Sequence, residues 1–219
     1  MAQQENKLGT APVGRLLTSL AIPCITAQVV NLLYNIVDRI YIGHIPEIGS
    51  TALTGVGVTF PIITIISAFS ALVGNGGAPR ASIRMGQKDN DGAEQILGNC
   101  LALSIVLSIL LIIVFELFGQ PLLMLFGASE NTIGYGWDYM SIYVLGTFFV
   151  TVTMGLNNFI SAQGFAKTSM ITVIIGAVIN IILDPIFIFV FNMGVAGAAW
   201  ATILSQAISC LWVLKFLTS

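Results

Sequence analysis

Six long stretches of apolar residues dominate this sequence, and each is long enough to cross a lipid bilayer as a helix. A hydrocarbon core about 30 Å thick requires roughly 20 apolar residues in helical form. Only 8% of the 219 residues are charged and 56% are hydrophobic, whereas a soluble domain is about 25% charged. A soluble protein of this length would lack the charges to cover its surface. The sequence therefore predicts an all-α, polytopic membrane protein, built as a bundle of six transmembrane helices in one domain over residues 1–219.

Short segments rich in glycine, proline and asparagine separate the apolar stretches, and such residues favour turns over helix. Residues 43–46 and 118–121 are two of these breaks. The six spans are predicted at approximately residues 14–42, 52–78, 93–117, 134–160, 168–191 and 194–216.

Lysine and arginine are distributed unevenly between the loops. The loops after the first, third and fifth spans contain neither residue, and Arg39 alone lies near that side. The other basic residues fall at the opposite ends of the spans; they are Lys7, Arg15, Arg80, Arg84, Lys88, Lys167 and Lys215. Because cytoplasmic loops are enriched in these residues, we expect both termini on the cytoplasmic side of the plasma (inner) membrane.

Asp184 lies within an otherwise uncharged apolar run, residues 174–190. A carboxylate inside a bilayer costs several kcal/mol, on the order of 3 on insertion scales. Asn180 precedes it by one turn on the same helical face, and Pro185 follows it directly. The proline predicts a helix kink that frees a backbone carbonyl one turn earlier. Such oxygens suit Na⁺ or a proton relay; the alternative is a protonated structural acid bonded to a carbonyl.

A stripe of polar side chains follows one face of the first span. Its members are spaced by three, four and three residues, which places them on one side of a helix; they are Gln28, Asn31, Asn35 and Asp38, with Tyr34 at the border. Amides that face lipid are costly, so we expect this face to line a cavity. The alternative is hydrogen bonding between helices, worth under about 2 kcal/mol per contact.

Helical rise places several of these polar groups at one depth. Asp38 lies about 6 Å, Asp184 about 10 Å and Thr202 about 12 Å from the outer ends of their spans at 1.5 Å per residue. Together with Asn180, these side chains are expected to share one layer in the outer half of the membrane. Asn157, toward the inner end of the fourth span, is a further candidate for the cavity lining.

Three parts of the sequence resemble signature motifs of the multidrug and toxic compound extrusion (MATE) transporters. Residues 29–43 resemble the first-span motif, 74–77 with 86–89 the second-span and loop motif, and 180–185 with 194–202 the fifth- and sixth-span motif. Within the family, the resemblance is to the MepA-like, DinF-related bacterial group. It implies a transporter and not an enzyme: an antiporter that exports cationic or amphipathic compounds in exchange for H⁺ or Na⁺, without any other cofactor.

The resemblance also implies roles for individual residues. The ion site of the N-terminal lobe corresponds to Asp38, Asn180, Asp184 and Thr202. The cavity-lining positions correspond to Gln28, Asn31, Tyr34, Asn35, Tyr139 and Asn157. No metal is expected other than Na⁺ at Asp38 and Asp184.

Members of the family have twelve spans in two six-helix lobes, whereas this chain has six. The resemblance therefore implies an N-terminal lobe that works with a missing C-terminal lobe or with a second copy, in contact with the lipid bilayer and with cationic substrates. Residues 215–219 stop at a span edge without a polar tail, so a truncated half is expected. A natural half-transporter and an inactive fragment are the alternatives.

Other functions fit the same residues less well. A lipid-linked sugar flippase of the related fold would hold pyrophosphate with cations, and only Arg39 lies within a predicted span. An intramembrane aspartyl protease would use two aspartates that share a proton, but its Gly-x-Gly-Asp signature is absent. The glycines of residues 74–77 lack the Gly-Lys-Ser/Thr of a nucleotide site, which favours close helix packing. No polybasic tract indicates a nucleic-acid partner.

Overall fold

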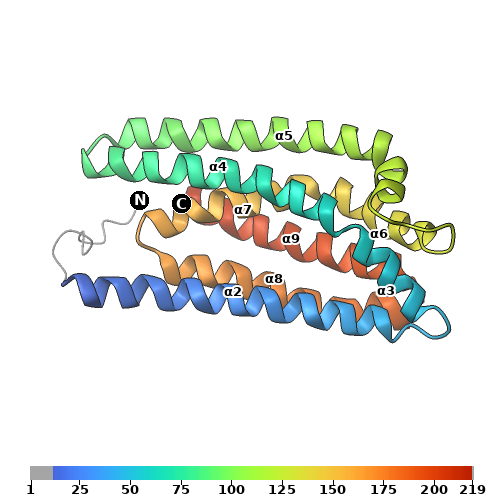
Figure 1. Cartoon of the computed structure of the whole chain (residues 1–219). Helices are drawn as coiled ribbons and strands as arrows, with labels where there is room; N and C mark the ends of the chain where they lie inside the picture. The colour runs from blue at the N-terminus through green and yellow to red at the C-terminus, as the bar shows by residue number, and fades with distance from the viewer. Residues whose placement is uncertain (1–11, 219) are drawn as a thin grey trace.

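The computed structural model describes residues 12–218, so the expectation for Lys7 lies outside the described residues. Helices lie side by side along one common axis (Figure 1), and no strand occurs within residues 12–218. In chain order the elements are α2 Val13–Gly43, α3 Gly49–Val58, α4 Phe60–Gly86, α5 Asn90–Leu125, α6 Ile133–Leu145, α7 Thr147–Ala162, α8 Ala166–Pro185, η1 Ile186–Val190 and α9 Gly194–Thr218.

The helices form the predicted six-span bundle. Five are long and apolar enough to cross a membrane by themselves: α2, α4, α5, α8 together with η1, and α9. The sixth crossing is the pair α6 and α7, which is bent by 57° between Leu145 and Thr147. At this bend Gly146 packs against the Ile203 side chain, which occupies the space that a Cβ would need.

The second span differs from its predicted form. It is broken at Thr59 into α3 and α4, because Thr59 closes the last turn of α3 with a side-chain bond to the Val56 carbonyl (2.7 Å). Pro61 lies in the first turn of α4, where its missing N–H breaks no helical bond. The helix α4 then continues to Gly86, so Arg80 and Arg84 lie on its last turns and not in a loop.

Glycines let α4 approach its neighbours closely. A Cβ on Gly74 would collide with the Asn158 side chain of α7, and one on Gly77 would collide with Cys100 of α5 and with Phe159. Close helix packing, as favoured from the sequence, is therefore the role of these glycines.

The third span is also longer than predicted, because α5 continues through the expected break at residues 118–121 as far as Leu125. Gly119 lies against the Trp137 and Met140 side chains of α6, which hold this part of α5 in place. At the other end, Asp89 caps α5 by accepting a hydrogen bond from the Gly92 N–H (2.9 Å).

The bundle has two distinct ends. The α4–α5 and α7–α8 turns lie at the end where α2 begins and α9 finishes, which we call the inner end (Figure 1). The basic residues of the described chain other than Arg39 belong to helices or turns at this end. Arg39 lies toward the outer end of α2 with its guanidinium over the Phe60 ring, 5.8 Å from the centroid.

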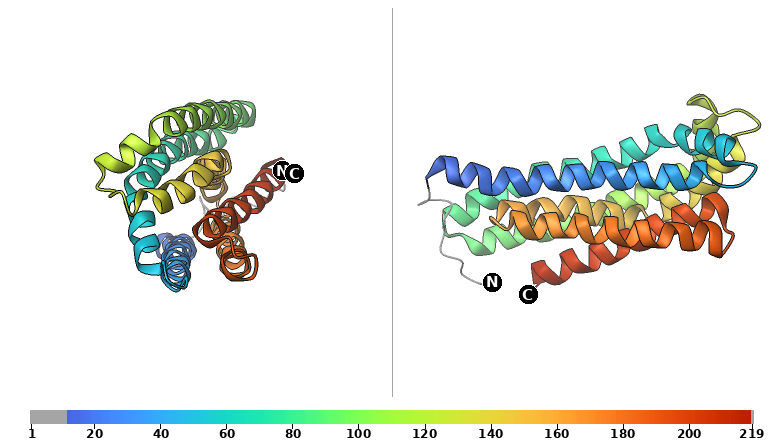
Figure 2. Two further views of the ribbon diagram at one scale, coloured as in Figure 1. Left: turned by 90° about the vertical axis from the view of Figure 1, so that its right-hand side faces the viewer. Right: turned by 90° about the horizontal axis from the view of Figure 1, so that it is seen from below.

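An end-on view shows how unevenly the spans are covered (Figure 2). The helices α4 and α5 lie on one side, α2, α8 and α9 lie on the other, and α7 runs between them. The helix α2 packs mainly against α8 and is the least buried of the spans. One long face of α2 is therefore left without a protein neighbour in this chain.

Candidate ion-binding site

Two polar side chains of α8 are enclosed in the apolar bundle. Asp184 is 0% exposed and Asn180 is 1% exposed. Because they are one helical turn apart, they share a face, and Asn180 Nδ2 donates a hydrogen bond to Asp184 Oδ1 (3.1 Å). The buried carboxyl group therefore keeps one protein donor.

The helix α9 adds a hydroxyl group to this pair. Thr202 Oγ1 lies 3.4 Å from Asn180 Nδ2, from which it accepts, and it donates to the Ala198 carbonyl (3.0 Å). Close approach of the two segments depends on Gly197, since a Cβ there would lie 2.7 Å from the Phe187 backbone. The small residue at this crossing thus brings Thr202 to the pair on α8.

The second carboxyl group comes from α2. Asp38 is 8% exposed although its helix is the least covered of the spans. Because α2 packs on α8, the Asp38 carboxyl group and that of Asp184 lie within electrostatic range of each other. At about 1.5 Å of rise per residue, Asp38, Asp184 and Thr202 lie roughly 8, 9 and 12 Å from the outer ends of their helices. The predicted single layer is therefore present in the structure.

Three oxygens of this cluster have no hydrogen-bond partner within the described residues. They are Asp38 Oδ1, Asn180 Oδ1 and Asp184 Oδ2, and all are buried. Buried polar atoms in folded proteins are almost always paired, and leaving one unpaired costs about 1–3 kcal/mol. Acceptor oxygens gathered without donors are the arrangement that a hard cation or a proton satisfies.

Two tyrosines lie near the carboxyl groups, and a third packs against one of them. Tyr34 lies within electrostatic range of Asp38 and Asp184, and Tyr139 lies beside Thr202. Tyr143 stacks on Tyr139 with ring centroids 6.0 Å apart. Sequence reasoning missed Tyr143, although its position one turn after Tyr139 places both rings on one face of α6.

The rest of the predicted stripe on α2 does not reach the carboxyl groups. Gln28 and Asn35 are exposed, and Asn31 is half-buried. Asn35 Nδ2 donates to the Asn31 carbonyl of its own helix (2.7 Å). These amides extend along the open face of α2 toward the inner end, as the predicted spacing requires.

Asn157, which was predicted to line the cavity and not to belong to the ion site, lies apart from the cluster. Its Nδ2 donates to the Ser169 carbonyl near the start of α8 (3.2 Å), and its Oδ1 is buried without a partner. Ser169 precedes Asp184 by about 22 Å of helix at 1.5 Å per residue. Asn157 therefore belongs to the inner half of the bundle.

The structure shows a change of helix type at the position of the predicted kink. The α-helix α8 ends at Pro185, and the chain continues as the π-helical turn η1. Proline removes one α-helical hydrogen bond, and wider π turns are frequent at functional sites. The irregular backbone therefore directly follows the buried acid.

The sequence matches the MatE family over residues 23–186, which is most of the chain. The chain belongs to the MatE family. Among curated relatives, this MatE chain is 31% identical over 196 residues to the multidrug export protein MepA of Staphylococcus haemolyticus, covering 90% of this chain and 43% of that protein. It is 28% identical over 204 residues to the FAD transporter of Shewanella oneidensis, covering 91% of this chain and 44% of that protein. The MatE chain thus spans about half the length of the curated relatives that it matches.

Solved structures agree with this placement. A crystal structure of MATE in the straight conformation superposes with a TM-score of 0.89 at 28% identity, over 99% of this MatE chain and 48% of the other. A superfamily transporter from Pyrococcus furiosus, described as having a binding pocket of reverse polarity, gives a TM-score of 0.90 at 28% identity, over 99% and 47%. The MatE chain therefore has the fold of one half of these proteins.

Proposed function

We propose that this chain is the cation-coupled lobe of an exporter that expels cationic or amphipathic compounds in exchange for H⁺ or Na⁺. The observation that carries the proposal is the meeting of two buried carboxyl groups, Asp38 and Asp184, whose outer oxygens lack partners. Asn180 and Thr202 complete the oxygen set. A bound proton or Na⁺ would satisfy these oxygens and reduce the repulsion between the two acids.

The coupling follows from where the two acids are attached. Asp38 is carried by α2, whereas Asp184 is carried by α8, beside the π turn. A cation between them favours the packing of α2 on α8, and its loss leaves like charges that favour separation. The bundle then has two arrangements, one with α2 packed on α8 and one with the two helices apart. An ion that binds these arrangements unequally shifts their populations, and this shift is what exchange requires. A cationic substrate on the open face of α2 would compete for the same negative charge.

The charges of the site favour cationic cargo over the anionic cargo of a flippase or of a flavin transporter. Arg39 neighbours Asp38 in sequence, but its guanidinium lies over Phe60. Arg80 and Arg84 lie near the inner end of α4. Pyrophosphate or a flavin nucleotide would require cations where this chain has carboxyl groups.

We expect Asp38 and Asp184 to act as one unit in cation binding. Binding of Na⁺ or H⁺ to the folded chain should raise its melting temperature by mass action. Asp38→Asn and Asp184→Asn should each remove most of this stabilisation, and the double variant should lose little more, with a coupling energy of about 1–3 kcal/mol. The measurement is melting temperature against Na⁺ concentration and against pH.

Asp138→Asn is the matched control, because Asp138 is an exposed carboxylate of α6 outside the cluster. This substitution should leave the cation dependence of the melting temperature unchanged. Strictly additive losses in the double variant would mean that the two acids bind cations at separate places, and the shared site would be wrong.

The chain is proposed to lie in the plasma (inner) membrane with the inner end of the bundle in the cytoplasm. In a variant whose own cysteines are replaced by alanine, a cysteine at the exposed Glu130 should react with an impermeant maleimide in intact cells. A cysteine at the exposed Lys167 should react only after the membrane is permeabilised. Rapid labelling at Lys167 in intact cells would reverse the orientation.

A further inference from the structure

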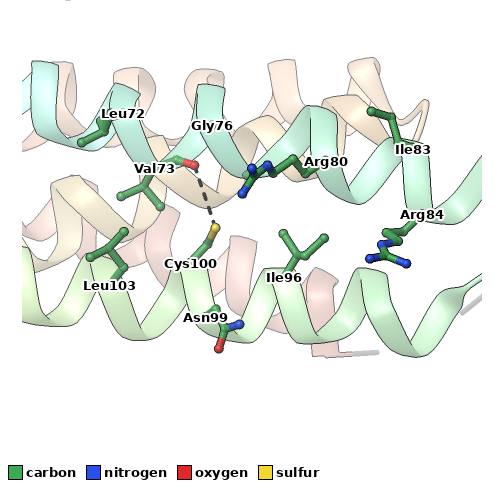
Figure 3. A pocket seen from close by; sticks show the side chains of 11 residues that line it. Leu72, Val73, Gly76, Arg80, Ile83, Arg84, Ile96, Asn99, Cys100 and Leu103 are labelled. Carbon is green, nitrogen blue, oxygen red and sulfur yellow. Dashed lines mark hydrogen bonds between the residues drawn. The ribbon is translucent and has the colours of Figure 1, made fainter.

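A groove with a cavity volume of about 910 Å³ lies between α4 and α5 in the inner half of the bundle (Figure 3). It is separate from the carboxylate cluster, which α2, α8 and α9 form in the outer half. Gly76 and Gly77 lie along its α4 wall, and at Gly76 a Cβ would meet no atom within 4 Å, so a larger side chain there would fill the groove. The volume lies within the range of about 300–1,000 Å³ that small-molecule sites occupy.

The half of the groove farther from the inner end is apolar. Leu72 and Val73 of α4 face Leu103 of α5, and Cys100 lies between the two walls (Figure 3). This part lies within the hydrocarbon region, since Leu72 precedes the end of α4 by about 21 Å at 1.5 Å per residue. An occupant of this half must therefore be a hydrocarbon chain or another apolar group.

The half nearer the inner end carries positive charge. Arg80 and Arg84 line it from α4 (Figure 3). Arg84 forms a salt bridge with Asp89 (2.9 Å). Arg80 forms none with any carboxylate of residues 12–218. No acidic residue lines the groove, so its inner half carries a guanidinium charge without a protein counter-ion.

We propose that this groove binds an anionic phospholipid of the inner leaflet. One acyl chain occupies the apolar half, and the phosphate accepts hydrogen bonds from the Arg80 guanidinium. Arg80 lies about 9 Å from the end of α4 at 1.5 Å per residue, and its guanidinium extends along the groove toward Cys100 (Figure 3). A cationic drug is excluded here by charge. Basic pockets between transmembrane helices on the cytoplasmic side are suited to anionic head groups.

The test is native mass spectrometry of the purified chain. The chain is released from nanodiscs that contain equal amounts of phosphatidylglycerol and phosphatidylcholine. The unmodified chain should retain phosphatidylglycerol in preference to phosphatidylcholine. Arg80→Gln should lower this preference about fivefold, because one arginine near a charged membrane surface contributes roughly 1 kcal/mol. Gly76→Leu should reduce retention of both lipids, because its side chain fills the apolar half.

Matched variants separate the groove from general effects. A Cβ on Gly76 meets no atom within 4 Å, and the same holds for Gly57 in α3, so Gly57→Leu controls for the substitution itself. Arg15→Gln controls for loss of one exposed arginine at the inner end. Both controls should retain the lipid preference, and added inorganic phosphate should not displace the lipid.

Three results would overturn the proposal. An unchanged lipid preference in a folded Arg80→Gln variant would show that Arg80 does not contact the phosphate. An equal loss of lipid preference in Arg15→Gln would show that anionic lipid is attracted by the surface charge in general and not by the groove. Displacement by millimolar inorganic phosphate would show a free-anion site without a lipid chain.

Discussion

Asp184→Asn is expected to abolish cation coupling while the bundle stays folded. The substitution keeps the shape of the side chain, and its remaining oxygen can still accept the hydrogen bond from Asn180 Nδ2. It removes a unit charge from a site that is 0% exposed. For a cation about 4 Å away at an effective dielectric constant of about 20, that charge contributes roughly 4 kcal/mol. Cation affinity should therefore fall on the order of a thousandfold.

Two measurements separate this effect from misfolding. Melting temperature without Na⁺ at neutral pH should be equal to or above that of the unmodified chain, because an unpaired buried charge has been removed. Ion-gradient-driven efflux, measured with the chain joined to a second lobe, should be lost. The exposed Asp138→Asn variant should keep both properties. Full efflux by a folded Asp184→Asn variant would mean that Asp184 contributes only to packing and not to cation coupling.

The number of membrane crossings was predictable from the sequence, because an apolar run of 20 or more residues has few alternatives to a membrane helix. Helix ends were less predictable, since charged residues end apolar runs without ending helices. Arg80 and Arg84 continue α4 beyond the apolar stretch, and long side chains of this kind extend out of the hydrocarbon region. Pro121 was read as a break, but packing of Gly119 on Trp137 keeps that segment helical.

The carboxylate cluster was predictable in depth but not in all of its members. Helical rise placed Asp38, Asp184 and Thr202 in one layer, because depth depends on position along a helix and not on how helices pack. Lateral position does depend on packing. Asn157 was expected to line the cavity; the structure places it beside Ser169 in the inner half of the bundle, and its cavity role stays a prediction. Tyr143 was missed although its spacing of four residues from Tyr139 could have indicated that both rings share one face of α6.

The groove between α4 and α5 was not predictable at all from one sequence. Its apolar walls consist of ordinary lipid-compatible residues, and only the pairing of two helices turns them into a cavity. The positive charge of the groove was not predictable either, because Arg80 was assigned to a loop. A salt bridge that neutralises Arg84 and leaves Arg80 unpaired is a property of the folded chain. Lipid sites of this kind therefore require the structure.

The largest effect of all is expected from a second lobe. The helix α2 leaves one long face uncovered, and that face carries the exposed amides of Gln28 and Asn35. Polar groups that face lipid are unfavourable, so this face is suited to a protein partner. The chain also spans only 43–45% of the MepA and FAD-transporter relatives. We propose that the chain alone in liposomes shows no ion-driven efflux and that adding a C-terminal lobe restores it.

Cys24 provides a direct readout of what covers this face. It is exposed on α2 one helical turn before Gln28, so it belongs to the same stripe. If two copies pair through this face, mild oxidation should produce a disulfide-linked dimer that Cys24→Ser abolishes. Joining the chain to a C-terminal lobe should protect Cys24 from oxidation and from maleimide, because the lobe buries the stripe. A stable, uncrosslinked monomer with full efflux would instead mean that these six spans enclose the whole transport path.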